Sequence, residues 1–187
     1  MPRLSLPAAF PSMNVLYNGV LFNISWLIIV TGESVAIGLA TIAVHLALHF
    51  RLMGRGMAEL KLIAAITAIG LLLDQALFFF GVFLVDGAPA TAPLWLSCLW
   101  PVFATTLCHA FSAFSTRLMF AAALGAVSGA GSYIVGTRLT AVDFASVLYG
   151  PMTLAVLWAI LFPAYLVLAA RMVPAAANNP QAEAGHA

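Results

Sequence analysis

The chain has 187 residues, of which 64% are hydrophobic and 7% are charged, and its formal net charge is +1. Soluble domains carry roughly 25% charged residues, so this composition excludes an ordinary soluble protein and predicts an integral membrane protein whose first partner is the lipid bilayer. The 7 basic residues are too few and too scattered for a nucleic-acid-binding surface, so we expect no nucleic-acid partner.

Six apolar runs long enough to cross a hydrocarbon core follow one another along the sequence. They cover residues 15–31, 34–50, 62–85, 95–114, 118–136 and 151–170. The short joints between them leave no room for a soluble domain. We therefore predict an all-α fold, a polytopic transmembrane bundle of six helices within residues 1–172. Residues 173–187 are small, polar and proline-containing, which predicts a disordered C-terminal tail.

The basic residues predict the orientation of this bundle. When the six runs cross the membrane alternately, Arg138 falls on one side and all the other cations fall on the opposite side. These others are Arg3, Arg51, Arg55, Lys61, Arg117 and Arg171. The positive-inside rule then places both termini in the cytoplasm.

The first two runs carry polar residues that are candidates for a binding site. Asn23 lies well inside the first run. In the second run, His45 and His49 are four residues apart, so they share one helical face. That spacing either presents two imidazoles to one metal ion or simply leaves His49 at the water interface, close to Arg51.

The third run has a single ionisable residue, Asp74, near the bilayer midplane. A carboxylate at that depth costs a few kcal/mol, so we expect its side chain to face other helices rather than lipid. Thr67, Gly70 and Gly81 fall on the same face at helical spacing, and the two glycines would let neighbouring helices approach closely.

The fourth run carries a polar stripe at helical spacing, made of Cys98, Pro101, Thr105, His109 and Ser112. Pro101 interrupts the backbone hydrogen bonds, so we expect a kinked helix here. Trp95, at the outer start of the run, is expected to be an interfacial anchor. His109 is the strongest functional candidate of the stripe, and helix tilt or one bridging water would let it meet Asp74.

The fifth run has small residues on one face, at Gly125, Gly129, Ser132 and Gly136. This small-residue seam predicts close contact with another helix. The contact is with a helix of the same chain, with a second copy in a homodimer or with another membrane protein. A passage lined by the seam is a further alternative.

Taken together, the polar residues leave several kinds of chemistry open. A hydrogen-bonded polar core that fixes helix register is the structural interpretation. An imidazole and a carboxylate in a site of low dielectric constant can instead exchange a proton or bind a polar headgroup. A metal site formed by His45, His49, His109 and Asp74 is a weaker alternative, and the sequence indicates no particular cofactor.

Three motifs give the chain a family resemblance. They are LLLD, which ends at Asp74, PLWLSCLWPVFATTLCHAF from Pro93, and GAGSYIVGTRLTAV from Gly129. In this order the chain resembles a bacterial inner-membrane family known as domain of unknown function 2878. The resemblance implies a multi-pass protein of the bacterial cytoplasmic membrane, and it brings no established activity. Members commonly have asparagine before the histidine of the fourth helix, where this chain has Cys108. The resemblance highlights Asn23, His49, Asp74, Trp95, Trp100, Thr106, His109, Ser132, Tyr133 and Gly136.

Three classes of function remain open on this basis. The first is a membrane-embedded enzyme or enzyme subunit that acts on a lipid-soluble substrate, with Asp74 and His109 as a catalytic acid/base pair. Its candidate binding residues are Asn23, His45, His49, Thr105, Thr106, Ser132 and Tyr133. The second is a small proton-coupled transporter in which Asp74 carries the proton. The third is a non-catalytic membrane assembly protein that binds a partner through its glycine faces.

Overall fold

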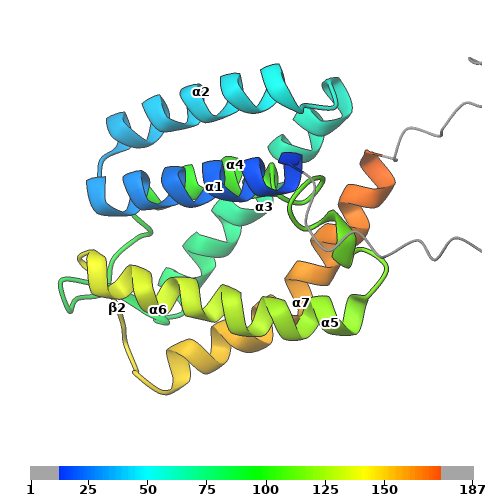
Figure 1. Ribbon diagram of the computed structural model, residues 1–187. Coiled ribbons are helices and arrows are strands. Elements are labelled where there is room, and N and C mark those ends of the chain that lie inside the picture. Colours follow the sequence, from blue (N-terminus) through cyan, green and yellow to red (C-terminus); the bar gives the residue numbers. More distant parts are fainter. Residues whose placement is uncertain (1–12, 174–187) are drawn as a thin grey trace, which may run out of the picture.

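Five helices in the computed structural model, which describes residues 13–173, are long and apolar enough to cross a membrane. They are α1 (Met13–Gly32), α2 (Val35–Leu52), α3 (Met57–Phe79), the run from Leu118 to Leu139, and α7 (Tyr149–Met172). The predicted tail lies outside the described residues, apart from Val173. Figure 1 shows α1 and α2 in the upper part of the view and the helix from Leu118 to Leu139 crossing below them. The predicted all-α transmembrane fold is confirmed.

The run from Leu118 to Leu139 is one continuous helix with a wider turn in its middle. It consists of α5 (Leu118–Leu124), the π-helical turn η3 (Gly125–Gly129) and α6 (Ala130–Leu139). Added carbon atoms at Gly125 and Gly129 would overlap Trp158 on α7. The predicted seam therefore makes its close contact within the chain at these two glycines. Gly136 has open space beside it and Ser132 is exposed, and binding of a partner there stays a prediction.

The fourth predicted helix is the segment that differs most from expectation. Instead of one helix over residues 95–114, this segment contains η1 (Leu96–Cys98), α4 (Leu99–Ala104) and η2 (Ser112–Phe114), joined by tight turns. Pro101 is the third residue of α4, where its missing amide would have no acceptor within the helix anyway. The helix stops only after Ala104, so proline does not explain the break.

Two hydroxyl side chains bond to the backbone where α4 ends. Thr105 and Thr106 donate to the carbonyls three residues earlier, at distances of 2.8 and 2.6 Å. The amides that follow also bond three residues back, as Leu107 does to Ala104 and His109 does to Thr106. Such side-chain bonds compete with the α-helical pattern, so the chain continues as tight turns.

The third helix also ends earlier than predicted. It stops at Phe79, and Gly81 then adopts a positive φ of 69°, which glycine tolerates without strain. Residues Phe83–Val85 form β1, which pairs antiparallel with β2 (Val142–Phe144). Gly81 therefore belongs to a turn and does not share a helical face with Asp74.

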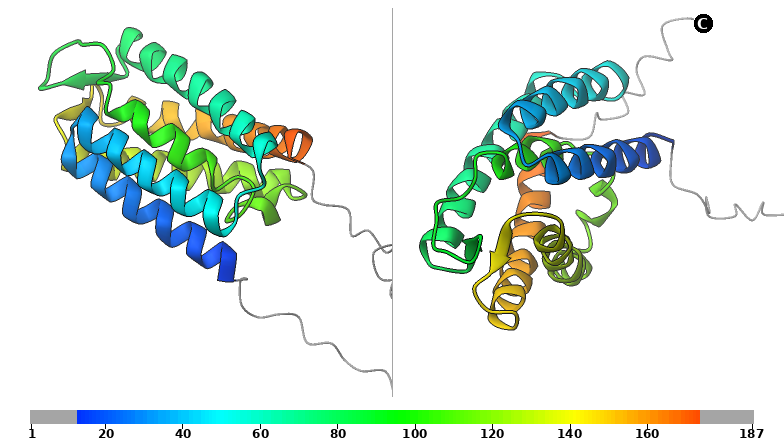
Figure 2. Two further views of the ribbon diagram at one scale, coloured as in Figure 1. Left: turned by 90° about the horizontal axis from the view of Figure 1, so that it is seen from above. Right: turned by 90° about the vertical axis from the view of Figure 1, so that its left-hand side faces the viewer.

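Three loops meet at one end of the bundle. The β1–β2 pairing joins the loop after α3 to the loop after α6. Glu33, between α1 and α2, accepts a hydrogen bond from the amide of Ala141 at 3.1 Å. The left-hand view of Figure 2 shows that the start of α1 and the end of α7 lie at the opposite end. The six segments thus alternate in direction, although only five are continuous helices. Which end faces the cytoplasm stays a prediction.

Candidate functional site

An apolar cavity of about 370 Å³ lies between α1, the fourth segment, the α5–α6 helix and α7. All 4 tryptophans of the chain line it, namely Trp26, Trp95, Trp100 and Trp158. Trp95 is buried, with 6% of its surface exposed, so it is not the predicted interfacial anchor. A cavity of this size and apolar character is typical of a site for a small organic ligand.

Asp74 lies in the wall of this cavity and is 1% exposed. The expectation that its side chain faces protein rather than lipid therefore agrees with the structure. The indole Nε1–H of Trp100 donates to Asp74 Oδ2 at 2.7 Å. Asp74 Oδ1 has no hydrogen-bond partner among the described residues. One oxygen of the carboxyl group is thus fixed by the protein and the other is left for a further partner.

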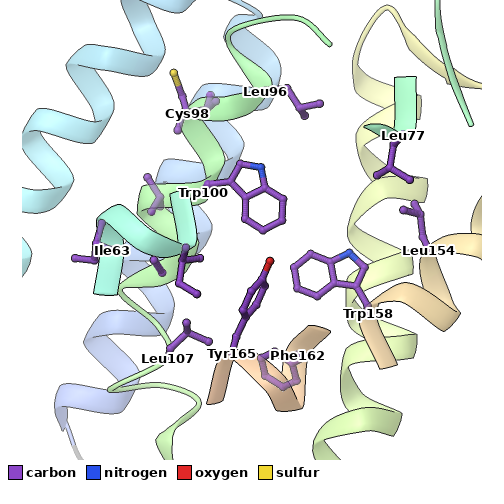
Figure 3. Packing of buried hydrophobic residues seen from close by; sticks show 14 of the residues in the cluster. Ile63, Leu77, Leu96, Cys98, Trp100, Leu107, Leu154, Trp158, Phe162 and Tyr165 are labelled. Atoms are coloured by element: carbon purple, nitrogen blue, oxygen red, sulfur yellow. The ribbon is translucent and has the colours of Figure 1, made fainter. Parts of the chain in front are cut away.

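Aromatic rings surround this carboxyl group. The indoles of Trp100 and Trp158 stack nearly parallel, with ring centroids 5.9 Å apart, and Tyr165 meets Trp100 edge to face. Figure 3 shows the Tyr165 hydroxyl directed into the space between the two indoles. Neither this hydroxyl nor Trp158 Nε1 has a hydrogen-bond partner within residues 13–173. Buried polar atoms without partners are rare, and this region has three.

Gly70 fixes the position of Trp100, because the indole lies against the glycine Cα. A methyl group added there would overlap the ring, so we predict that Gly70→Ala displaces Trp100 from Asp74 and lowers the free energy of unfolding by about 1–3 kcal/mol. Gly19→Ala is the matched control, because no atom lies within 4 Å of the added carbon and the helix gains propensity. Unfolding in detergent mixtures of rising sodium dodecyl sulfate content measures both. Equal stability of the two variants would contradict the prediction.

A second polar cluster is formed by His49, Glu59 and His109. Glu59 Oε1 lies 3.0 Å from His49 Nε2 and 2.9 Å from His109 Nε2. Glu59 Oε2 accepts the backbone N–H of Arg55 at 2.6 Å. His49 and Glu59 are fully buried and His109 is 7% exposed. One carboxylate thus ties α2, α3 and the fourth segment together.

His45 does not join this cluster. Its Nδ1 contacts the hydroxyl of Ser25 at 2.9 Å and its Nε2 contacts the hydroxyl of Thr105 at 3.0 Å. Both ring nitrogens therefore have partners, and the imidazole links α1 to the fourth segment. The side chain of Thr106 bonds to the backbone of its own segment. These contacts fit the polar-core interpretation for His45, Thr105 and Thr106.

The structure does not bring Asp74 and His109 together. Asp74 and Glu59 are fifteen residues apart in the continuous helix α3, which separates them by about 22 Å along its axis. Because His109 is bonded to Glu59, it cannot also reach Asp74. The four residues considered as a metal set do not form one site. His49 and His109 belong to the Glu59 cluster, His45 stacks beside His49 but is bonded to Ser25 and Thr105, and Asp74 is bonded to Trp100.

Other predicted binding residues lie beside the cavity. Ser132 and Tyr133 line it, as does Asn23, although the Asn23 amide donates to Gly19 O and the side chain is exposed. Two residues outside the predicted set make the contacts that organise the histidine cluster and the fourth segment. Glu59 is the centre of the histidine cluster, and Asn18 is fully buried against the fourth segment.

The comparison with protein families gives one match. The model of the family described as "Protein of unknown function (DUF2878)" matches residues 15–164, most of the chain. No curated protein and no solved structure matches the chain. The predicted family resemblance is thereby confirmed, and the description of the family states no activity.

Proposed function

We propose a function for this chain, which belongs to the DUF2878 family of proteins of unknown function, from the geometry of its cavity. The chain is a membrane-embedded enzyme or enzyme subunit that binds a lipid-soluble substrate in the aromatic cavity, where Asp74 meets the polar end of that substrate. The observation that carries the proposal is the free oxygen of a buried carboxyl group in the wall of an apolar cavity. We place the protein in the bacterial cytoplasmic membrane.

The position of the cavity supports entry of the substrate from the membrane. Residues with exposed side chains line it on two sides, Asn23 on α1 and Ser128 and Ser132 on the opposite helix. All three lie near the middle of helices of membrane-spanning length. An opening between α1 and the α5–α6 helix at that depth faces hydrocarbon, so an apolar molecule reaches the cavity without crossing water.

The unpartnered polar atoms define the polar end of the substrate. Trp158 Nε1–H can only donate, so the substrate must offer an acceptor. Asp74 Oδ1 accepts when the carboxyl group is ionised, so the substrate must also offer a donor. A hydroxyl or an amide headgroup meets both requirements, and a methyl ester or an alkane does not. Asp74 is then the group that exchanges a proton with the headgroup, and His109 takes no part because it does not line the cavity.

The tryptophans make the proposal directly testable, because every indole in the chain lines the cavity. The probe is a bromine-labelled long-chain alcohol, added to the full-length protein in lipid nanodiscs, and the readout is tryptophan fluorescence. We expect saturable quenching that unlabelled alcohol reverses and the matching alkane does not. Quenching that rises linearly with probe content and resists competition would overturn the proposal.

Two variants and one control variant sharpen this test. Asp74→Asn removes the charged acceptor, and we expect the affinity for the alcohol to fall at least about tenfold, since a hydrogen bond to a charged group contributes about 1.5–3 kcal/mol. Gly131→Leu places a side chain in the cavity, because Gly131 lines it with open space at its Cβ position, and should abolish saturable quenching. Gly19→Leu has the same open space away from the cavity and should bind normally. Equal binding of the alcohol by the Gly131→Leu and Gly19→Leu variants would argue against the cavity as the binding site.

A further inference from the structure

The His49, Glu59 and His109 cluster has no role in the proposed cavity function, because none of its members lines the cavity. We propose that these three side chains form a binding site for one divalent transition-metal ion of the zinc class. The ligand atoms would be the two imidazole Nε2 nitrogens and Glu59 Oε1, at the end of the bundle opposite the β1–β2 pair.

The spacing of the three atoms fits a metal ion. All of them lie within 4.8 Å of one another. Tetrahedral coordination at zinc–nitrogen and zinc–oxygen bond lengths near 2.0–2.1 Å requires ligand atoms about 3.3 Å apart. The two distances to Glu59 Oε1 are 3.0 and 2.9 Å, so small outward shifts of the side chains would admit the ion.

The charge of the cluster also favours a cation. Glu59 is fully buried, and its ion-pair partners among the described residues are these two histidines alone. A buried carboxylate is costly unless it is paired or bound to a metal. For both Nε2 atoms to donate to an ionised Glu59, each must carry a proton. A divalent ion would take the place of those two protons and neutralise the carboxylate.

The donor set indicates which kind of metal. Two imidazoles and one carboxylate suit zinc and similar transition metals, whereas calcium and magnesium prefer oxygen ligands throughout. Three protein ligands leave a fourth position for water or another small ligand, as in catalytic zinc sites.

The surrounding backbone holds the ligands in place before any ion binds. The Arg55 amide fixes Glu59 Oε2 and so orients the carboxylate. His49 and Glu59 face each other across the short turn between α2 and α3. The turn that carries His109 is held by Asn18, whose Oδ1 accepts the N–H of Ala110. A preorganised set of this kind loses little conformational freedom on binding.

The test is metal binding by the purified full-length protein, prepared without a polyhistidine tag and stripped with a chelator. Cobalt(II) is the probe, because its visible absorption spectrum reports tetrahedral coordination, and zinc competition gives the affinity. We expect one ion per chain. Glu59→Gln and His109→Gln should each weaken binding more than 100-fold. Both variants keep side chains of similar size, and elution as a single peak in size-exclusion chromatography checks that they fold.

His45→Gln is the matched control, since His45 is equally buried but bonded to Ser25 and Thr105. It should bind cobalt with unchanged stoichiometry and spectrum. A wild-type protein that binds neither ion would overturn the proposal, as would a folded Glu59→Gln variant that binds as tightly as the wild type. Loss of binding in His45→Gln equal to that in Glu59→Gln would also overturn it. Alcohol binding in the cavity is measured separately, so either proposal can fail alone.

Discussion

Replacing Trp100 with alanine is expected to lower the free energy of unfolding by about 3–5 kcal/mol, the usual range for truncating a buried tryptophan. Trp100 is 4% exposed, stacks on Trp158 and lies against Gly70. Its removal leaves a cavity next to the existing one and deprives Asp74 of the one hydrogen bond that its side chain makes within residues 13–173. Unfolding by sodium dodecyl sulfate in mixed micelles, followed by circular dichroism, measures the loss.

Two further substitutions separate the contribution of Trp100 packing to the free energy of unfolding from that of its hydrogen bond to Asp74. Trp100→Phe keeps an aromatic ring but no donor, so Asp74 Oδ2 loses its partner and neither oxygen of the carboxyl group is then bonded, at an expected cost of about 1–3 kcal/mol. In an Asp74→Leu background the same change should cost less, because no carboxyl group remains to be left unpaired. Trp26→Ala is the control for tryptophan removal in general, since Trp26 is only half-buried. Wild-type stability of Trp100→Phe would contradict the assigned role of the Trp100–Asp74 hydrogen bond.

The membrane-spanning character of the chain could be predicted from its sequence because it depends on apolar length, and five of the six runs contain a helix long enough to cross a membrane. The fourth run, residues 95–114, is also largely apolar but is not continuously helical. Apolar content measures whether a segment tolerates hydrocarbon, and it says little about how backbone groups are bonded inside the protein. The hydroxyls of Thr105, Thr106, Ser112 and Ser115, each bonded three residues back, were the available signal.

The burial of Asp74 could be predicted for the same reason, because lipid penalises a carboxyl group strongly enough to decide where its side chain points. The residue that bonds to Asp74 could not be predicted in this way. The expected meeting of His109 with Asp74 assumed a continuous fourth helix, and the tight turns after Ala104 instead bring His109 to Glu59. Estimates of depth along a helix fail at the first break in that helix.

Glu59 was not among the predicted site residues because it lies just before the third apolar run, where a charge usually marks the water interface. The α2–α3 hairpin contained the information that was needed. In an antiparallel pair of helices, residues at equal distances from the turn lie opposite each other. His49 and Glu59 are each five residues from Gly54, and they are in contact. A histidine and a glutamate at such symmetric positions predict a buried pair.

Asn18 shows how an irregular segment is accommodated inside the bundle, and it leads to the second large expected effect. Its Nδ2 donates to Thr105 O at 3.4 Å, and its Oδ1 accepts the N–H of Ala110 at 3.3 Å. Both backbone groups lie where α4 has ended and no helical partner exists. Inside a membrane protein, water rarely replaces such bonds, so one asparagine on α1 supplies them.

We therefore predict that Asn18→Leu lowers the free energy of unfolding by about 2–5 kcal/mol, since it leaves two buried backbone groups unpaired. Asn23→Leu is the matched control on the same helix, because Asn23 is exposed and its side chain donates to Gly19 O of its own helix. It should change stability by less than about 0.5 kcal/mol. Unfolding in mixed micelles measures both variants.

The same substitution also connects the bundle to the metal site. Ala110 follows His109, so loss of the Asn18 bond releases the turn that places His109 against Glu59. Cobalt affinity should therefore fall about 10–100-fold in Asn18→Leu, as expected for a residue that positions a ligand without touching the ion, and stay unchanged in Asn23→Leu. If Asn18→Leu is destabilised but binds cobalt normally, His109 is held by Glu59 alone. Wild-type stability of Asn18→Leu would show that the turn needs no support from α1.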